Sequence, residues 1–145
     1  MKKLIFVSLL LLLLSFNSAL AARFYFDVAQ RDFYVGELVP VQIFLDTQQE
    51  SINTINLKIS YPKEYLNVES ISSGNSIVNF WVETLAGVIV GGYNGNRGLI
   101  TRLNFRALKV GQVKIGFNSA SEAYLNDGRG TLAGLNLSNV VVINI

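Results

Sequence analysis

The stretch that decides the fold class is TINLKISYPKEYLNVESISSG, residues 54–74. Every second residue from Ile55 to Tyr61 is apolar, and the residues between them are polar. A period of two places the apolar set on one face of a β-strand. We therefore predict a half-buried strand whose odd-numbered side chains point into a core.

The same stretch also predicts where that strand stops and the next one starts. Pro62 cannot donate a hydrogen bond to a strand partner, so it ends the strand. Leu66 returns the chain to the core after a short corner, and Val68 lies in the following strand. The residues Ser72–Gly74 are typical of a turn.

Working outward, short runs rich in Val, Ile and aromatic residues recur along the chain, with Gly- and Asn-rich turns at 94–98 and 126–130. This spacing is typical of an antiparallel β-sandwich of about nine strands, and a closed barrel is the competing architecture. Residues 23–29 are expected to form an edge strand, and Pro40 indicates an edge position or a strand start. The other expected strands cover residues 38–46, 76–83, 86–93, 99–107, 109–117, 119–125 and 135–145.

Alternation also predicts which side chains form the core. Thr101 is the one polar residue expected on the inner face of its strand. The expected core residues are Ile55, Leu57, Ile59, Leu66, Leu103, Phe105, Val113 and Ile115.

The N-terminus has the pattern of a secretory signal. Lys2 and Lys3 precede an apolar run of 11 residues, Leu4 to Leu14, which is short for a membrane span. Small residues at Ala19 and Ala21 suit signal peptidase. We predict a signal peptide over residues 1–21 and one domain over 22–145; an uncleaved anchor extending to Ala22 is the alternative.

The exported protein is expected to begin at Ala22, without a membrane anchor, and to be secreted to the periplasm or the outside of the cell. No cysteine follows the apolar run, so lipid attachment through cysteine is excluded. Mass spectrometry of the exported protein checks this prediction, and an intact Met1 or Lys2 would contradict it.

Removal of the signal leaves 124 of 145 residues, enough for one core without disulfides. It also removes two of the 12 basic residues, which leaves 10 against 10 acidic ones. A net charge near zero does not support a nucleic-acid-binding surface.

The composition excludes the commonest catalytic chemistry. The chain has no histidine and no cysteine, so it lacks a Ser-His-Asp triad, a thiol nucleophile and histidine metal ligands. The carboxylates Glu64, Glu69, Glu83, Glu122 and Asp127 lie at turns or on outward positions and show no paired spacing. Asn126–Gly128 resembles part of a calcium loop, but it lacks the other ligands, and a hairpin turn is the favoured interpretation. We therefore expect no enzyme, no cofactor and no metal site.

Several short motifs follow one another between Tyr34 and Ile145. They are the opening Val35–Val41; the strand Leu57–Tyr61 with Pro62, Leu66, Val68 and Gly74; the strand with Ile100, Leu103, Phe105 and Ala107; and the late segment Ala123–Thr131. In the order of these motifs, the chain resembles the cohesin domain, in the superfamily shared with bacterial carbohydrate-binding modules. One departure is that Tyr61 is followed directly by Pro62, where many cohesins carry an intervening Asp.

The resemblance implies a nine-stranded jelly-roll sandwich and a non-catalytic module that docks a dockerin-like protein in polysaccharide-degrading or cell-surface assembly. The alternative is a carbohydrate-binding module that attaches directly to polysaccharide. Exposed aromatic rings can contribute to either function, and Phe44, Trp81, Tyr93 and Tyr124 are expected off the inward registers or in turns. For Trp81, a ring half-covered by a neighbouring strand is an equal alternative.

The strand that starts at Thr54 and the strand expected over residues 76–83 supply the candidate binding residues. The resemblance implies that the sheet containing these strands is the docking sheet. Alternation places three outward residues on each strand. The predicted binding residues are Asn56, Lys58, Ser60, Asn79, Trp81 and Glu83.

Overall fold

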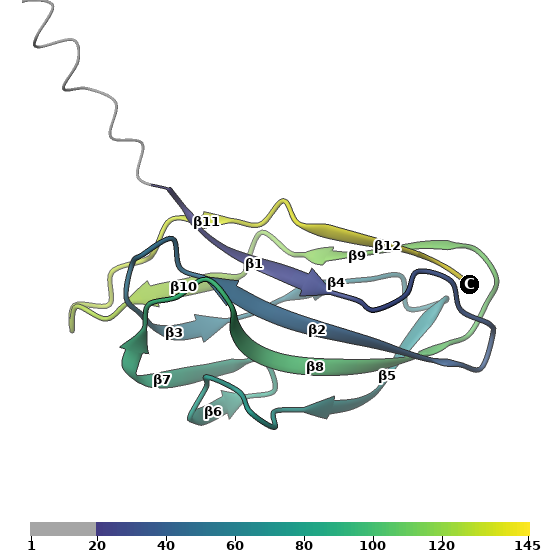
Figure 1. The fold of residues 1–145 in the computed structure, drawn as a ribbon, viewed down its shortest axis with the longest axis horizontal. Helices are drawn as coiled ribbons and strands as arrows, with labels where there is room; N and C mark the ends of the chain where they lie inside the picture. Colours follow the sequence, from purple (N-terminus) through teal and green to yellow (C-terminus); the bar gives the residue numbers. More distant parts are fainter. Residues whose placement is uncertain (1–19) are drawn as a thin grey trace, which may run out of the picture.

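All regular elements in the described residues, 20–145 of the computed structural model, are β-strands (Figure 1). No helix in this part of the chain has the length and hydropathy needed to cross a membrane. The predicted signal segment lies outside the described residues except for its last two positions.

The strands form two layers. One layer is a five-stranded sheet with the order β11 (Leu135–Asn136), β1 (Ala22–Asp27), β2 (Leu38–Asp46), β8 (Gly98–Ala107) and β5 (Leu66–Ser72). The opposite layer contains a four-stranded sheet, β10 (Glu122–Leu125), β3 (Ile52–Asn56), β7 (Ala86–Tyr93) and β6 (Phe80–Glu83). It also contains a three-stranded sheet, β12 (Val140–Asn144), β9 (Gln112–Phe117) and β4 (Ile59–Ser60). The predicted all-β sandwich is therefore confirmed.

The described chain has twelve strands instead of the predicted nine, because some expected strands are interrupted. The predicted strand through Ile55 and Ile59 is two strands: β3 pairs with β10 and β7, and β4 pairs with β9. The chain changes sheets at Leu57 and Lys58, whose amides donate to the Leu85 carbonyl and the Ser121 hydroxyl. These bonds satisfy the backbone where the ladder stops. The expected final strand is likewise divided into β11 and β12.

The prediction of an edge position for the first strand was wrong, because β1 pairs with β2 on one side and with the short β11 on the other. Sequence alternation could not reveal the returning β11. Pro40 lies near the start of β2, beyond Gln42, where the pairing with β1 ends. The missing N–H of Pro40 therefore lies where β2 has β8 as its only strand partner.

The core contains seven of the eight predicted residues in buried positions, and Ile59 is half-buried against it. Aromatic contacts join the two layers: Phe26 on β1 stacks on Phe117 of β9 with ring centroids 4.2 Å apart. Phe105 on β8 meets the edge of Tyr61 at 5.0 Å. Thr101 is buried as expected, and its hydroxyl donates to the Ser72 carbonyl at 3.1 Å.

Gly87 on β7 is a position where the packing requires the absence of a side chain. A Cβ atom built there would lie 2.5 Å from Val78 Cγ1 and 2.6 Å from the Phe80 carbonyl oxygen. Because one of these neighbours is backbone, Gly87→Ala is expected to lower the free energy of unfolding by about 1–3 kcal/mol. Urea denaturation followed by circular dichroism measures this loss. Gly74→Ala is the control, since its nearest neighbour would be 3.9 Å away, and equal losses would contradict the prediction.

Candidate functional site

The outer surface of the sheet β10-β3-β7-β6 is the candidate site. Paired residues on neighbouring strands share one face of a sheet. The buried residues Ile55 and Ala123 are paired, and Ile55 also pairs with Gly87, so this row faces the core. The rows on either side of it face outward. They are Tyr124, Thr54, Val88 and Phe80 in one row, and Glu122, Asn56, Ala86 and Glu83 in the other.

This surface carries apolar side chains that water reaches. Phe80 is 65% exposed and Val82 is 74% exposed on the edge strand β6, while Val90 on β7 is 62% exposed. Adjacent exposed apolar side chains on a flat sheet are characteristic of a surface that a partner covers. We call the surface formed by all the residues of these two outward rows, together with Val82 and Val90, the four-strand face.

Polar groups lie beside these apolar side chains. The Oδ1 atom of Asn56 is buried and has no hydrogen-bond partner among residues 20–145. The Tyr124 hydroxyl donates to the Glu122 carboxylate at 2.9 Å, and this bond, with burial and the negative charge, raises the pKa of Tyr124. The hydrogen bond holds the Glu122 carboxylate in place. The face thus combines apolar groups with fixed acceptors.

Four of the six predicted binding residues come together at this face. Asn56 and Glu83 flank Ala86 in one row. Lys58 Nζ lies 3.9 Å from Glu83 Oε2, so an ion pair joins the two predicted triplets. Asn79 lies just before β6, and its side-chain oxygen accepts from the Val90 amide at 2.7 Å.

The other two predicted residues lie elsewhere. Ser60 is exposed but belongs to β4 in the three-stranded sheet. Trp81 is half-buried and packs against the core, because it pairs with Gly87 in the inward row. The prediction that Trp81 points outward was therefore wrong. A β-bulge between Trp81 and Glu83 breaks the alternation, so the two side chains do not share a face.

Sequence reasoning missed Phe80 and Val82 as the exposed apolar residues of this strand. The sequence Phe80-Trp81-Val82 is apolar without a break, so alternation could not show which ring faces water. A missing side chain at Gly87 was the available signal, because it leaves room for the Trp81 indole on the inner side.

A groove runs along the open edge of the sandwich beside the four-strand face. Its volume is about 690 Å³, and its walls include the buried side chains of Leu57 and Leu103. Lys58 and Glu83 also line it, so the ion pair lies where the groove meets the face. A partner side chain that enters from this face finds an apolar wall with one charge of each sign beside it.

The remaining candidate residues from the sequence pack within the fold or close a turn. Phe44 was predicted to be exposed, but only 6% of it is, because Tyr25 stacks on it at 5.5 Å and Arg97 covers it at 4.6 Å. Tyr93 is half-buried against the core. The Asp127 carboxylate accepts from the Arg129 amide and the Thr131 hydroxyl, so it closes a hairpin turn. Those hydrogen bonds lower the pKa of Asp127.

Among the other carboxylates named in the sequence, Glu69 forms a two-point ion pair with Arg106 that ties β5 to β8. Hydrogen bonding by that guanidinium lowers the pKa of Glu69. Glu64 is exposed in the corner that follows Pro62.

No protein-family model and no curated protein matches the sequence. The structure, however, matches solved cohesin structures. A cohesin module from a family 33 glycoside hydrolase of Clostridium perfringens is 15% identical with a TM-score of 0.68, covering 86% of this chain and 96% of that one. The third ScaB cohesin of R. flavefaciens, solved with a group 1 dockerin, is 15% identical with a TM-score of 0.65, covering 87% and 96%.

A third match is a type I cohesin of Clostridium thermocellum, also solved as a complex with a dockerin. It is 14% identical with a TM-score of 0.54, covering 85% of this chain and 99% of that one. Sequence identities this low show similarity of fold alone, and the match covers almost the whole length of each cohesin module. The chain therefore has a jelly-roll β-sandwich fold similar to that of these cohesin modules.

Proposed function

We propose that this protein is an exported, non-catalytic docking module that binds a dockerin-like protein through the four-strand face. The observation that carries the proposal is the exposed group of Phe80, Val82 and Val90 beside the polar row of Asn56 and Glu83. Two of the matched cohesins were solved as complexes with dockerins, which supports a partner of this class.

The chemistry of the face fits a protein partner better than a crystalline polysaccharide. Stacking on sugar rings favours a row of exposed aromatic side chains. The outward row holds one strongly exposed ring, Phe80, while Tyr124 is half-buried and hydrogen-bonded to Glu122. A mixed surface of apolar side chains with a polar border is typical of protein–protein interfaces. The setting that we propose is polysaccharide degradation or cell-surface assembly outside the cytoplasm.

Asn56 supplies a specific polar contact in this proposal. Its buried Oδ1 atom lacks a partner within residues 20–145, and an unpaired buried acceptor costs free energy. A rotation of the half-buried Asn56 side chain would bring this oxygen to the surface, where a donor from the partner, such as a serine or threonine hydroxyl, would satisfy it. Discrimination between partners would then follow from whether that donor is present.

Calorimetric titration of the protein with a panel of purified dockerin modules tests the proposal, and co-sedimentation with insoluble cellulose and xylan tests the polysaccharide alternative. We expect saturable one-to-one binding to at least one dockerin, and we expect the four-strand face to make no contribution to sedimentation with either polysaccharide. Sedimentation alone, or no binding in either assay, would contradict the proposal.

A further inference from the structure

A polar cleft lies away from the four-strand face, between the loop that joins β2 to β3 and the loop that joins β7 to β8. Its volume is about 480 Å³. Neither loop was assigned a function from the sequence. The lining residues are Asp46, Gln48, Gln49, Asn94, Gly95 and Asn96.

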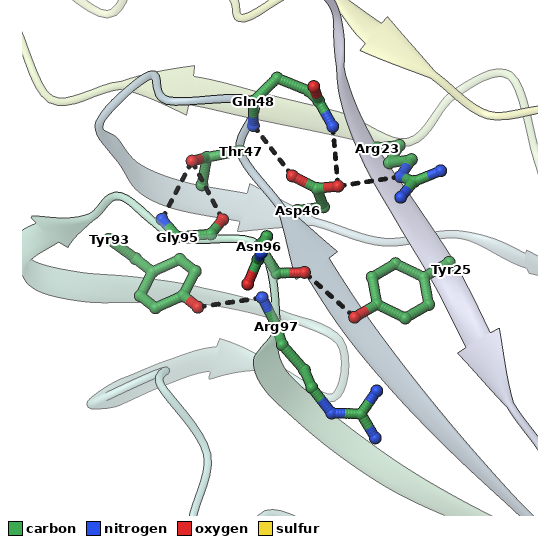
Figure 2. A network of polar contacts seen from close by, with 9 residues as sticks. All are labelled: Arg23, Tyr25, Asp46, Thr47, Gln48, Tyr93, Gly95, Asn96 and Arg97. Atoms are coloured by element: carbon green, nitrogen blue, oxygen red, sulfur yellow. Dashed lines mark hydrogen bonds and ion pairs between the residues drawn. The ribbon is translucent and has the colours of Figure 1, made fainter.

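The two loops are fastened to each other through Thr47. Figure 2 shows the Thr47 hydroxyl facing Gly95, whose amide donates to that hydroxyl at 3.1 Å. The Thr47 amide in turn donates to the Gly95 carbonyl at 2.8 Å. The Thr47 hydroxyl also donates to that carbonyl at 3.1 Å. Thr47 is fully buried, so these bonds are shielded from water and hold the cleft open in one shape.

Asp46 forms the base of the cleft and is almost entirely buried. One carboxylate oxygen accepts from the Gln48 amide at 3.1 Å, and the other accepts from Gln48 Nε2 at 2.7 Å and from Arg23 Nε at 3.0 Å (Figure 2). These bonds hold Gln48 and Gln49 at φ values of 51° and 74°, which glutamine rarely adopts. Backbone strain of this kind persists where the surrounding contacts impose it.

The side chains above this base keep their hydrogen-bonding capacity. No hydrogen bond within residues 20–145 involves the side-chain amides of Gln49, Asn94 or Asn96. Each carboxamide offers two donor hydrogens and an acceptor oxygen. Their position on a fastened backbone fits a ligand whose groups both donate and accept.

The charges around Asp46 exclude two ligand classes. The Arg23 guanidinium pairs with the only carboxylate of the cleft, and calcium sites of useful affinity need several oxygen ligands with net negative charge. Because the two charges of this ion pair offset each other, the cleft has no net positive charge to hold an anion either. What remains is a neutral ligand rich in hydroxyl groups, since a pair of neighbouring hydroxyls matches the donor and acceptor of one carboxamide.

We propose that this cleft is a binding site for a neutral carbohydrate, contacted by the side chains of Gln49, Asn94 and Asn96. It is separate from the four-strand face, so the protein can hold a sugar chain and a protein partner at once. The proposal does not depend on the docking function.

The experiment is a titration of ¹⁵N-labelled protein with cellopentaose, xylopentaose and mannopentaose, followed by heteronuclear NMR. At least one of them should shift the backbone amides of residues 46–49 and 94–97 in a saturable manner. The double variant Asn94→Ala/Asn96→Ala should weaken that binding about tenfold or more. The control Asn67→Ala removes an exposed carboxamide from β5 and should leave the affinity unchanged.

Gln49→Asn is a second variant in case the loops of the double variant misfold, because asparagine tolerates positive φ while its shorter side chain withdraws the amide. It should weaken binding as well. The proposal is overturned if none of the three sugars shifts these amides, if only calcium chloride does, or if the shifts lie elsewhere. Unchanged affinity in both variants would also overturn it.

Discussion

Replacing Phe105 by alanine is expected to lower the free energy of unfolding by about 3–5 kcal/mol. Phe105 is fully buried near the end of β8, and its ring meets Tyr61 from the opposite layer at 5.0 Å. The alanine leaves a cavity between the two layers and removes the aromatic contact that joins them. Urea denaturation of the purified variant, followed by circular dichroism, measures the change.

The matched control for this prediction is Phe80→Ala. It removes the same ring from a side chain that is 65% exposed, so its effect on stability should stay within about 0.5 kcal/mol. A loss below about 1 kcal/mol for Phe105→Ala would show that β8 faces the core differently. Comparable losses for the two variants would contradict the assignment of Phe80 to the surface.

Phe80→Asp is expected to weaken dockerin binding about 100-fold or more, or roughly 3 kcal/mol. The substitution removes the largest exposed apolar side chain of the four-strand face and adds a negative charge near Glu83. The partner must then cover an unpaired carboxylate. Calorimetric titration with the dockerin that binds the unchanged protein best measures the loss.

Leu38→Asp is the control, because Leu38 is an exposed apolar residue on the five-stranded sheet, in the opposite layer. It should leave the affinity unchanged. Trp81→Ala separates the two roles of β6: it should lower the stability, since the indole packs against the core. If Trp81→Ala weakens binding strongly while stability is unchanged, Trp81 is the anchor after all and the face has been misassigned.

The sequence predicted which sheet carries the candidate site better than it predicted which side chains face outward on that sheet. Asn56 lies between the buried residues Ile55 and Leu57, and the structure places it in one outward row with Glu83. The predicted orientation of Trp81 was wrong because the extra residue of a β-bulge changes which side chains face outward. Bulges leave no periodic signal in the sequence. The role of all six residues in binding stays a prediction.

The polar cleft was even harder to predict from the sequence than the four-strand face. Asp46 and Gly95 are far apart in the sequence: Asp46 ends the strand expected over residues 38–46, and Gly95 lies in the turn expected over residues 94–98. Their proximity comes from the pairing of β2 with β8, which brings Leu45 opposite Gly98. Hydrogen bonds from Thr47 then align the two loops.

Residue patterns alone were sufficient for the all-β class, the interior positions of Leu57, Leu103 and Phe105, and the turns at Asn94–Gly98 and Asn126–Gly130. These properties follow from local alternation and turn chemistry, which act over a few residues. Three-dimensional packing was needed for the change of sheet at Leu57–Lys58, for the inward position of Trp81 and for the cleft above Asp46. Each of these depends on a partner segment distant along the chain, whose backbone hydrogen bonds and side-chain volume select one arrangement among several that the local pattern allows.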